Sequence, residues 1–393
     1  MTTPVESVRT LTNQTDLINP TNPTNDARTD LLGLTYGDLR DWLTARGSQA
    51  YRAKQLCDGI YHALLDDFER ITGLPTALSA TLAREATIAG PRVQAALESK
   101  DGRTRKLLLQ LADGKRIETV LMLYPASAEG RARATVCVST QAGCAFGCTF
   151  CATGQMGFER HLTAGEIVAQ VVYVARELRA RPWTAPDGSL IERVTNLVFM
   201  GMGEPLHNYA NTLKALNILN MPEGLNIGAR HMTVSTVGLV PGILKLAQES
   251  LQVNLAISLH APNNAMRGRT MPVTRKYPIE AVLEAVQAYV ARTGRQVTFE
   301  YVLLAGENDS VVHARELAEL LAPLAQFGHV NLIPVNQTAA GYKPPSGEAI
   351  RAFRATLRAG GVTSSVRAER GDDIAAACGQ LRTRIGPSRV SVS

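Results

Sequence analysis

The stretch Ala134-Thr-Val-Cys137-Val-Ser-Thr-Gln-Ala-Gly-Cys144-Ala-Phe-Gly-Cys148-Thr-Phe-Cys151 decides how the rest of the chain is interpreted. Its apolar, β-branched start predicts a strand over 136–140 that leads into a glycine-containing loop with the spacing C-x3-C-x2-C. Three thiolates this close together suit a 4Fe–4S cubane, which takes one sulfur ligand per iron and is here left with one open iron. A zinc knot is the alternative, but zinc usually takes four ligands in C-x2-4-C pairs, and no second pair exists here.

Strands and helices alternate after this loop. Five further apolar runs predict strands, at residues 194–200, 231–237, 253–259, 297–304 and 329–335. Helical periodicity separates them, near residues 209–220, 241–250, 279–293, 310–325 and 347–359, and a capping box of Thr163 and Glu166 begins a helix after the loop. Six strands with such crossovers predict an α/β fold, an open parallel (β/α)6 barrel over 131–360. Ligands of such folds bind at the C-terminal strand ends, where the cysteine loop lies.

The segments outside the barrel differ in composition. Residues 1–29 are rich in Thr, Asn and Pro, and we expect a disordered leader. Residues 30–100 have helical periodicity and are expected to form a small accessory domain. On the basis of charge placement, we expect this domain to bind RNA. Two apolar strands around Asp113-Gly114 predict a β-hairpin linker over 101–130. A C-terminal segment over 361–393 follows the barrel.

Composition sets the class of protein. The chain has 393 residues, 45% of them hydrophobic and 19% charged, as in ordinary globular proteins. No apolar run approaches the roughly 18 residues of a membrane span, and no signal pattern precedes the first domain. Six cysteines, three of them clustered, do not suggest a disulfide framework, and a labile cluster needs a reducing compartment. We therefore expect a cytoplasmic protein.

The net charge of +6 is concentrated near the C-terminus. From Arg351 onward there are eight arginines against three acidic residues. Such a surface attracts a polyanion such as RNA through its phosphates, and a solvated basic face is the alternative.

Polar residues end several of the predicted strands. Paired glycines in Gly201-Met-Gly203-Glu204-Pro205 allow close approach of a ligand, and Glu204 can accept a hydrogen bond from an ammonium group. The other strand ends carry Ser235, Ser258-Leu259-His260 and Asn336. One polar strand end is more often structural than functional, but a set on the rim that bears an open cluster indicates a binding site.

The cysteine loop followed by a GxGEP strand end resembles the radical S-adenosylmethionine (SAM) superfamily. Four wider motifs, at 137–144, 201–206, 256–263 and 370–380, are similar to those of the RlmN family of dual-specificity RNA methyltransferases, and the likeness runs from about Leu31 to Ile385. The chain departs from the family pattern at His161, where Asn is more common, and in its long leader.

This resemblance implies the cofactors and their ligands. One 4Fe–4S cluster would be held by Cys144, Cys148 and Cys151, and the amino and carboxylate groups of SAM would chelate its open iron. Two SAM molecules would be used per methylation. Carried over by motif position, the contacts with SAM would be Gly203, Glu204, Ser235, Ser258, Leu259, His260 and Asn336.

The resemblance also implies a mechanism. Carbon 2 of adenine is electron-poor and cannot attack the methyl group of SAM, so the Cys378 thiolate takes a methyl group first. A 5′-deoxyadenosyl radical then removes hydrogen from that methyl group, and the carbon radical adds to adenine. Glu118 accepts the proton at carbon 2, and Cys137 attacks the Cys378 sulfur to leave a disulfide. Without the resemblance, both cysteines would be interpreted as inert buried thiols and Glu118 as solvent-exposed.

The implied substrates are an adenosine of 23S rRNA in the peptidyl-transferase centre and the adenosine 3′ to the anticodon in a subset of tRNAs. The implied redox partner is an electron donor such as flavodoxin or ferredoxin, and we expect a monomer without a membrane partner. Three alternatives remain open: a Cfr-type enzyme that methylates carbon 8, an electron carrier, and an RNA-binding module with a structural metal. An electron carrier would normally have a fully ligated cluster.

Overall fold

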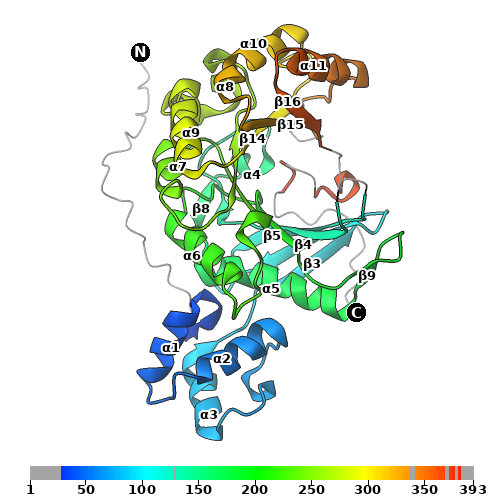
Figure 1. Ribbon diagram of the computed structural model, residues 1–393. Helices are drawn as coiled ribbons and strands as arrows, with labels where there is room; N and C mark the ends of the chain where they lie inside the picture. Colours follow the sequence, from blue (N-terminus) through cyan, green and yellow to red (C-terminus); the bar gives the residue numbers. More distant parts are fainter. Residues whose placement is uncertain (1–27, 128–129, 337–340, 368–370, 377–378, 382–393) are drawn as a thin grey trace, which may run out of the picture.

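The computed structural model describes residues 28–127, 130–336, 341–367, 371–376 and 379–381 (Figure 1). Its centre is one ten-stranded sheet with the order β16-β15-β14-β13-β12-β11-β6-β5-β4-β3. The strands are β3 (Arg92–Glu98), β4 (Thr104–Gln110), β5 (Arg116–Tyr124), β6 (Arg133–Cys137), β11 (Asn196–Phe199), β12 (Met232–Thr236), β13 (Asn254–Ser258), β14 (Val297–Leu303), β15 (Gly328–Pro334) and β16 (Thr363–Val366). Pairing is parallel from β6 through β16 and antiparallel from β6 back to β3.

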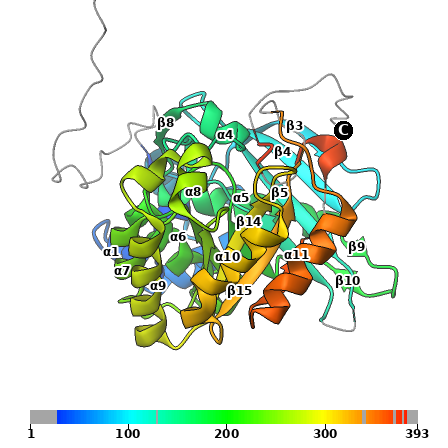
Figure 2. The ribbon, with the colours of Figure 1, turned by 90° about the horizontal axis from the view of Figure 1, so that it is seen from above.

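The predicted (β/α)6 barrel is confirmed by the parallel run β6, β11, β12, β13, β14 and β15. Helices cover the outer side of this curved sheet (Figure 2). They are α5 (Ala164–Ala180), α6 (Tyr209–Asn220), α7 (Val240–Leu246), α8 (Asn264–Thr270), α9 (Ile279–Thr293), α10 (Val311–Leu321) and α11 (Gly347–Ala359). The predicted capping box begins α5, with Thr163 and Glu166 each accepting the other's backbone hydrogen bond. In the part of the chain that is described, none of the helices has the length and apolar character to span a bilayer.

The first and last barrel strands differ from the prediction. The first is Arg133–Cys137 rather than 136–140. Val138 and Thr140 still donate backbone hydrogen bonds, to Val198 and Met202, but lie beyond the regular ladder. Residues 141–143 and 158–161 instead form a two-stranded ribbon, β7 (Gln141–Gly143) with β8 (Phe158–His161). A seventh parallel strand, β16, begins the segment that was expected to follow the barrel.

The hairpin forms around Asp113-Gly114 as predicted, but it is an extension of the barrel sheet. Strand β5 pairs with β6, with Val120 opposite Cys137, and β3 pairs with β4. Residues 92–98 were expected in the helical domain and are a strand instead. The apolar residues of the hairpin are buried against the neighbouring strands. The hairpin therefore forms one wall of the barrel mouth.

The N-terminal helices pack beside α5 and α6 (Figure 1). They are α1 (Tyr36–Thr44), α2 (Arg52–Cys57), α3 (Thr76–Glu85), the π-helical turn η2 (Asp58–His62) and the 3-10 turns η1 (Leu31–Gly33) and η3 (Phe68–Arg70). Strand β1 (Thr29–Asp30) pairs with β2 (Ala86–Thr87), so Thr29 belongs to the folded unit and not to the expected leader. The rest of that leader, residues 1–27, lies outside the described residues.

Asp30 predicts a pH dependence of stability. Its buried carboxyl accepts a hydrogen bond from Leu32 N at 3.0 Å, and burial raises its pKa from 3.8 to about 7. The folded protein therefore holds a proton that the unfolded chain releases at lower pH, so the free energy of unfolding falls as pH rises from about 4 to 7. Asp30→Asn should stabilise the protein by about 2–4 kcal/mol at pH 8 and by less at pH 5. Urea unfolding of the apoprotein at both pH values measures this, and an equal effect at both would contradict it.

Candidate active site

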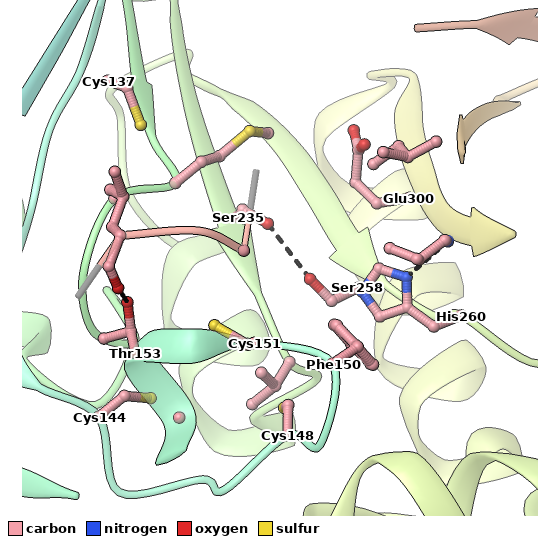
Figure 3. A pocket seen from close by; sticks show the side chains of 18 of the residues that line it. Cys137, Cys144, Cys148, Phe150, Cys151, Thr153, Ser235, Ser258, His260 and Glu300 are labelled. Carbon is pink, nitrogen blue, oxygen red and sulfur yellow. Dashed lines mark hydrogen bonds between the residues drawn. The ribbon is translucent and has the colours of Figure 1, made fainter. Parts of the chain in front are cut away.

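A cavity lies at the C-terminal ends of the parallel strands, where the cysteine loop, the hairpin and the C-terminal segment meet (Figure 3). Most of the side chains singled out from sequence line it together. These are Cys137, Cys144, Cys148, Cys151, Gly203, Glu204, Ser235, Ser258, His260 and Asn336. The rim position expected from the topology is therefore where these residues gather.

The cysteine loop is shaped by glycines. Gly143 has φ +74°, and a Cβ atom there would lie 2.0 Å from Gly157 O. Cys144 N donates to the same carbonyl at 2.8 Å, and Cys151 N donates to Cys148 O at 3.1 Å. These contacts fold the loop onto the β7–β8 ribbon and the short helix α4 (Ala152–Gln155), and all three thiols line the cavity.

The chemistry of the three thiols fits an iron–sulfur cluster. Burial raises the pKa of Cys144 to about 12 and that of Cys148 further, so their thiolates need a compensating positive charge. Within the described ranges, no three His, Cys, Asp or Glu side chains lie close enough to hold a single metal ion. Three cysteine thiolates around one cavity are the donor set that a 4Fe–4S cubane takes, with one thiolate at each of three irons.

The Gly201–Pro205 segment forms the cavity wall beside the cysteine loop. Gly203 has φ +96°, and a Cβ atom there would lie 2.5 Å from the Cβ of Gln141, so only glycine fits. Glu204 is buried and accepts from Leu206 N at 3.0 Å and Val237 N at 2.8 Å. Burial raises its pKa to about 7, against the effect of these hydrogen bonds. Thr236 also donates a side-chain hydrogen bond to Glu204, and an ionised carboxylate can accept about four hydrogen bonds, so room remains for a ligand donor.

Gln141 lies inside the motif 137–144 but was not predicted as a site residue, and it supports this wall. Its Oε1 accepts from Glu204 N at 2.9 Å. Its Nε2 donates to His161 Nδ1 at 2.9 Å and to His207 Nδ1 at 3.1 Å. Burial lowers the pKa of His161 to about 4, so the imidazole is neutral and suited to accept this bond.

The next two strand ends place hydroxyls and an imidazole on the rim. Ser235 Oγ and Ser258 Oγ lie 3.5 Å apart (Figure 3). His260 has φ +58° and accepts from Val302 N through Nδ1 at 3.0 Å. Because Nδ1 is the acceptor and burial lowers the pKa of His260 to about 3, the ring is neutral and its proton sits on Nε2. His260 can therefore donate to a ligand.

Leu259 does not join the other predicted contacts. Its side chain is buried in the main apolar core, and it is not among the residues that line the cavity. Its carbonyl accepts from Arg267 Nε at 3.1 Å. Leu259 follows the last residue of β13 and its side chain points away from the cavity, so its contact with SAM stays a prediction.

Glu118 is buried and not exposed as its hairpin position alone would suggest. On β5 it shares a face with Val120 and Met122, both of which line the cavity. Its Oε1 lies 3.4 Å from Nζ of Lys106, and both side chains are almost fully buried. Cys137 is opposite Val120, so Glu118 and Cys137 belong to the same wall.

Cys378 lies outside the described residues, but described residues before and after it in the sequence border the cavity. Ala376, Gly379 and Leu381 are lining residues. Ala152 N donates to Gly379 O at 2.7 Å, and Thr153 Oγ1 donates to Leu381 O at 2.7 Å. The described residues contain no disulfide bond, and the predicted pairing of Cys137 with Cys378 stays a prediction.

Glu300 and Arg367 are charged residues that line the cavity and were not predicted as site residues. Glu300 on β14 is buried and accepts from Asn331 Nδ2 at 2.9 Å. Burial raises its pKa, while Arg367 and this hydrogen bond act in the opposite direction. A carboxylate inside the apolar run Val297–Leu303 was the available signal, since a charge in a central strand needs a partner or a function.

Two family models match this chain. That of the radical SAM superfamily matches residues 138–318, which include the cysteine loop. A second, described as the ribosomal RNA large subunit methyltransferase N-terminal domain, matches residues 29–88. The superfamily implies a 4Fe–4S cluster and SAM, in agreement with the chemistry of the three thiols.

Named relatives match along most of their length. A probable dual-specificity RNA methyltransferase RlmN of Roseiflexus sp. is 47% identical, covering 91% of this chain and 96% of its own. The ribosomal RNA large subunit methyltransferase N of Nitrosopumilus maritimus is 46% identical, covering 91% and 99%. A crystal structure of a radical SAM methyltransferase from Sphaerobacter thermophilus is 48% identical, with a TM-score of 0.84 and coverage of 91% and 100%. With both domain models matched, this chain belongs to the RlmN family of radical SAM RNA methyltransferases.

Proposed function

We propose that this protein methylates carbon 2 of an adenosine in 23S rRNA, at the peptidyl-transferase centre, and of the adenosine 3′ to the anticodon in a subset of tRNAs. One observation carries the proposal. The three loop cysteines and Cys137 line one cavity together with Ala376 and Gly379, which precede and follow Cys378 in the sequence, and Glu118 lies on the same wall. This set matches the roles that the family resemblance assigns, and the relatives' names include both rRNA and dual specificity.

The cavity walls divide between cofactor and substrate. The cysteine loop would hold the cluster, and Glu204, the two serines and His260 would hold SAM beside it. Bound there, the cluster and SAM would supply the hydrogen-abstracting radical that carbon 2 requires.

The remaining steps would use Cys378, Glu118 and Cys137. Cys378 accepts a methyl group from the first SAM, and the resulting carbon later joins adenine. Glu118 takes the proton from carbon 2, and the unpaired electron of the adduct would return to the oxidised cluster, which restores the aromatic ring. The Cys137 thiolate attacks the Cys378 sulfur, so that an S–S bond forms while the S–C bond to the RNA breaks. The carbon leaves with the electron pair and takes up a proton as the new methyl group, and an external reductant restores both thiols.

RNA would dock on the basic side of the barrel mouth. Arg351 and Arg358 are exposed on α11, and Arg367 lines the cavity itself. We include the N-terminal helices over 30–90 in this docking surface, because the matched family model assigns that unit to ribosomal RNA methyltransferases. Binding through phosphates should weaken steeply with added salt. We further propose action as a cytoplasmic monomer, with a flavodoxin-like or ferredoxin-like electron donor.

The test is methylation of purified RNA by the reconstituted full chain. A 23S rRNA fragment and tRNA transcripts are incubated anaerobically with reductant and methyl-deuterated SAM, and the nucleosides are separated by mass spectrometry. We expect 2-methyladenosine carrying deuterium in both RNAs, and none with Cys378→Ala. Formation of 8-methyladenosine would contradict the position and favour the Cfr-type alternative. Methylation of only one RNA would contradict dual specificity.

A further inference from the structure

Lys106 occupies an unusual place on β4. In the sequence it stands between Arg105 and the apolar run Leu107–Leu109. Its side chain, which carries an ammonium group, is only 6% exposed. Its Nζ donates to Ala375 O at 3.0 Å and lies 3.4 Å from Glu118 Oε1. A buried ammonium is costly unless it is paired, so an apolar residue would be the cheaper choice for packing alone. The position calls for a functional explanation.

The contact with Ala375 belongs to a wider attachment of the C-terminal segment. Gly371 packs on Thr104, where a Cβ atom would lie 2.7 Å from Thr104 Cγ2. Asp373 Oδ2 accepts from Lys100 N at 2.9 Å. Residues 371–376, which include the 3-10 turn η7 (Asp372–Ile374), are thereby fixed on the hairpin, and residues 379–381 are fixed on α4. Cys378 follows the Lys106 contact by three residues in sequence.

We propose that Lys106 is a positioning residue that holds the general base Glu118 and residues 371–376, which precede Cys378 in the sequence, in one fixed relation. The proposal rests on the proposed function, in which both residues act on one adenosine. One ammonium has three donors and can bind the carboxylate of one strand and the carbonyl of the other segment together. Its positive charge also favours the ionised carboxylate that can accept a proton. Loss of this bridge would let Glu118 and residues 371–376 move relative to each other.

The consequence is specific to late steps of the reaction. Small misplacement of reacting groups commonly lowers rates by about 100-fold without affecting binding of the rest of the substrate. If Glu118 is misplaced, the proton at carbon 2 is removed slowly, and the RNA stays joined to Cys378. A variant lacking the ammonium should therefore accumulate the covalent RNA adduct, whereas loss of folding would give none.

The experiment compares Lys106→Met, which keeps the length of the side chain, with Lys106→Arg, which keeps its charge. Lys115→Met is the matched control, because Lys115 lies on the same hairpin but pairs with Glu159 at the surface, at 2.6 Å. Iron and sulfide content, steady-state methylation and the covalent RNA adduct are measured on each full-length protein. Lys106→Met should keep its iron, lose about 10- to 100-fold in kcat with KM for RNA within about threefold, and carry the adduct. Lys106→Arg should recover at least part of kcat, and Lys115→Met should resemble wild type.

Three results would overturn the inference: wild-type turnover by Lys106→Met, slow turnover without any adduct, or loss of iron in that variant. The last would mean that Lys106 only supports the cavity wall. All variants are measured against wild-type turnover. If the wild-type chain itself methylates no RNA, the proposed function fails, and this failure is distinct from a Lys106→Met variant that matches an active wild type.

Discussion

Replacing any one of Cys144, Cys148 and Cys151 with alanine is expected to remove the iron–sulfur cluster and SAM cleavage together. The three thiols line one cavity from a loop whose shape is set by glycines, so no neighbouring cysteine of the loop can take over for the lost ligand. Anaerobically purified wild type should contain about four irons and four sulfides per chain, and each variant close to none. SAM cleavage by dithionite-reduced protein, measured as 5′-deoxyadenosine, should fall to background.

Cys57→Ala is the matched control for this experiment. Cys57 is buried in the apolar core among the N-terminal helices, and burial raises its pKa to about 12, as expected of an inert thiol. Its removal should cost about 1 kcal/mol of stability or less and leave the iron content unchanged. Stoichiometric zinc without sulfide in wild-type protein would contradict the cluster and restore the zinc alternative.

The parts of the fold with strong local patterns could be predicted from the sequence. The helices Tyr209–Asn220, Ile279–Thr293 and Gly347–Ala359 have the expected ends, because amphipathic periodicity is encoded within each segment. The polar residues at the strand ends of the rim could also be located from sequence, because the alternation of predicted strands and helices marks where each strand ends. Their convergence on one cavity followed from the rule that parallel strands share a C-terminal edge.

Features that depend on pairing between distant segments could not be predicted. Whether the hairpin is a linker or part of the barrel is decided by the pairing of Val120 with Cys137, which no local pattern records. The Lys106 contact with Ala375 joins residues 269 positions apart, and Gln141 acts on Glu204 from 63 positions away. Leu259 is a different case: it stands between Ser258 and His260, and strand alternation already argued against its side chain facing the same cavity.

Cys137→Ala and Cys378→Ala are expected to fail at opposite ends of one reaction. Cys378 is the first methyl acceptor, so Cys378→Ala should lose methylation to background, since no carbon is then presented to the radical. Cys137 acts last, and Cys137→Ala should still load the methyl group and add it to adenine. The thioether to RNA then has no thiolate to resolve it, and the variant should be isolated with covalently attached RNA. Electrophoresis before and after nuclease treatment, with mass spectrometry of the Cys378 peptide, measures both results.

The position of Cys137 in the structure allows the two variants to be compared directly. Cys137 ends β6 and lines the cavity opposite Val120, so alanine removes a sulfur from the wall without disturbing the ladder. Both single variants should therefore keep the cluster, and their iron content is the control for folding. In the double variant the adduct should disappear, because Cys378 must form it before Cys137 can be needed. Normal turnover by Cys137→Ala with no attached RNA would show that another group resolves the intermediate, and the assignment of Cys137 would then be wrong.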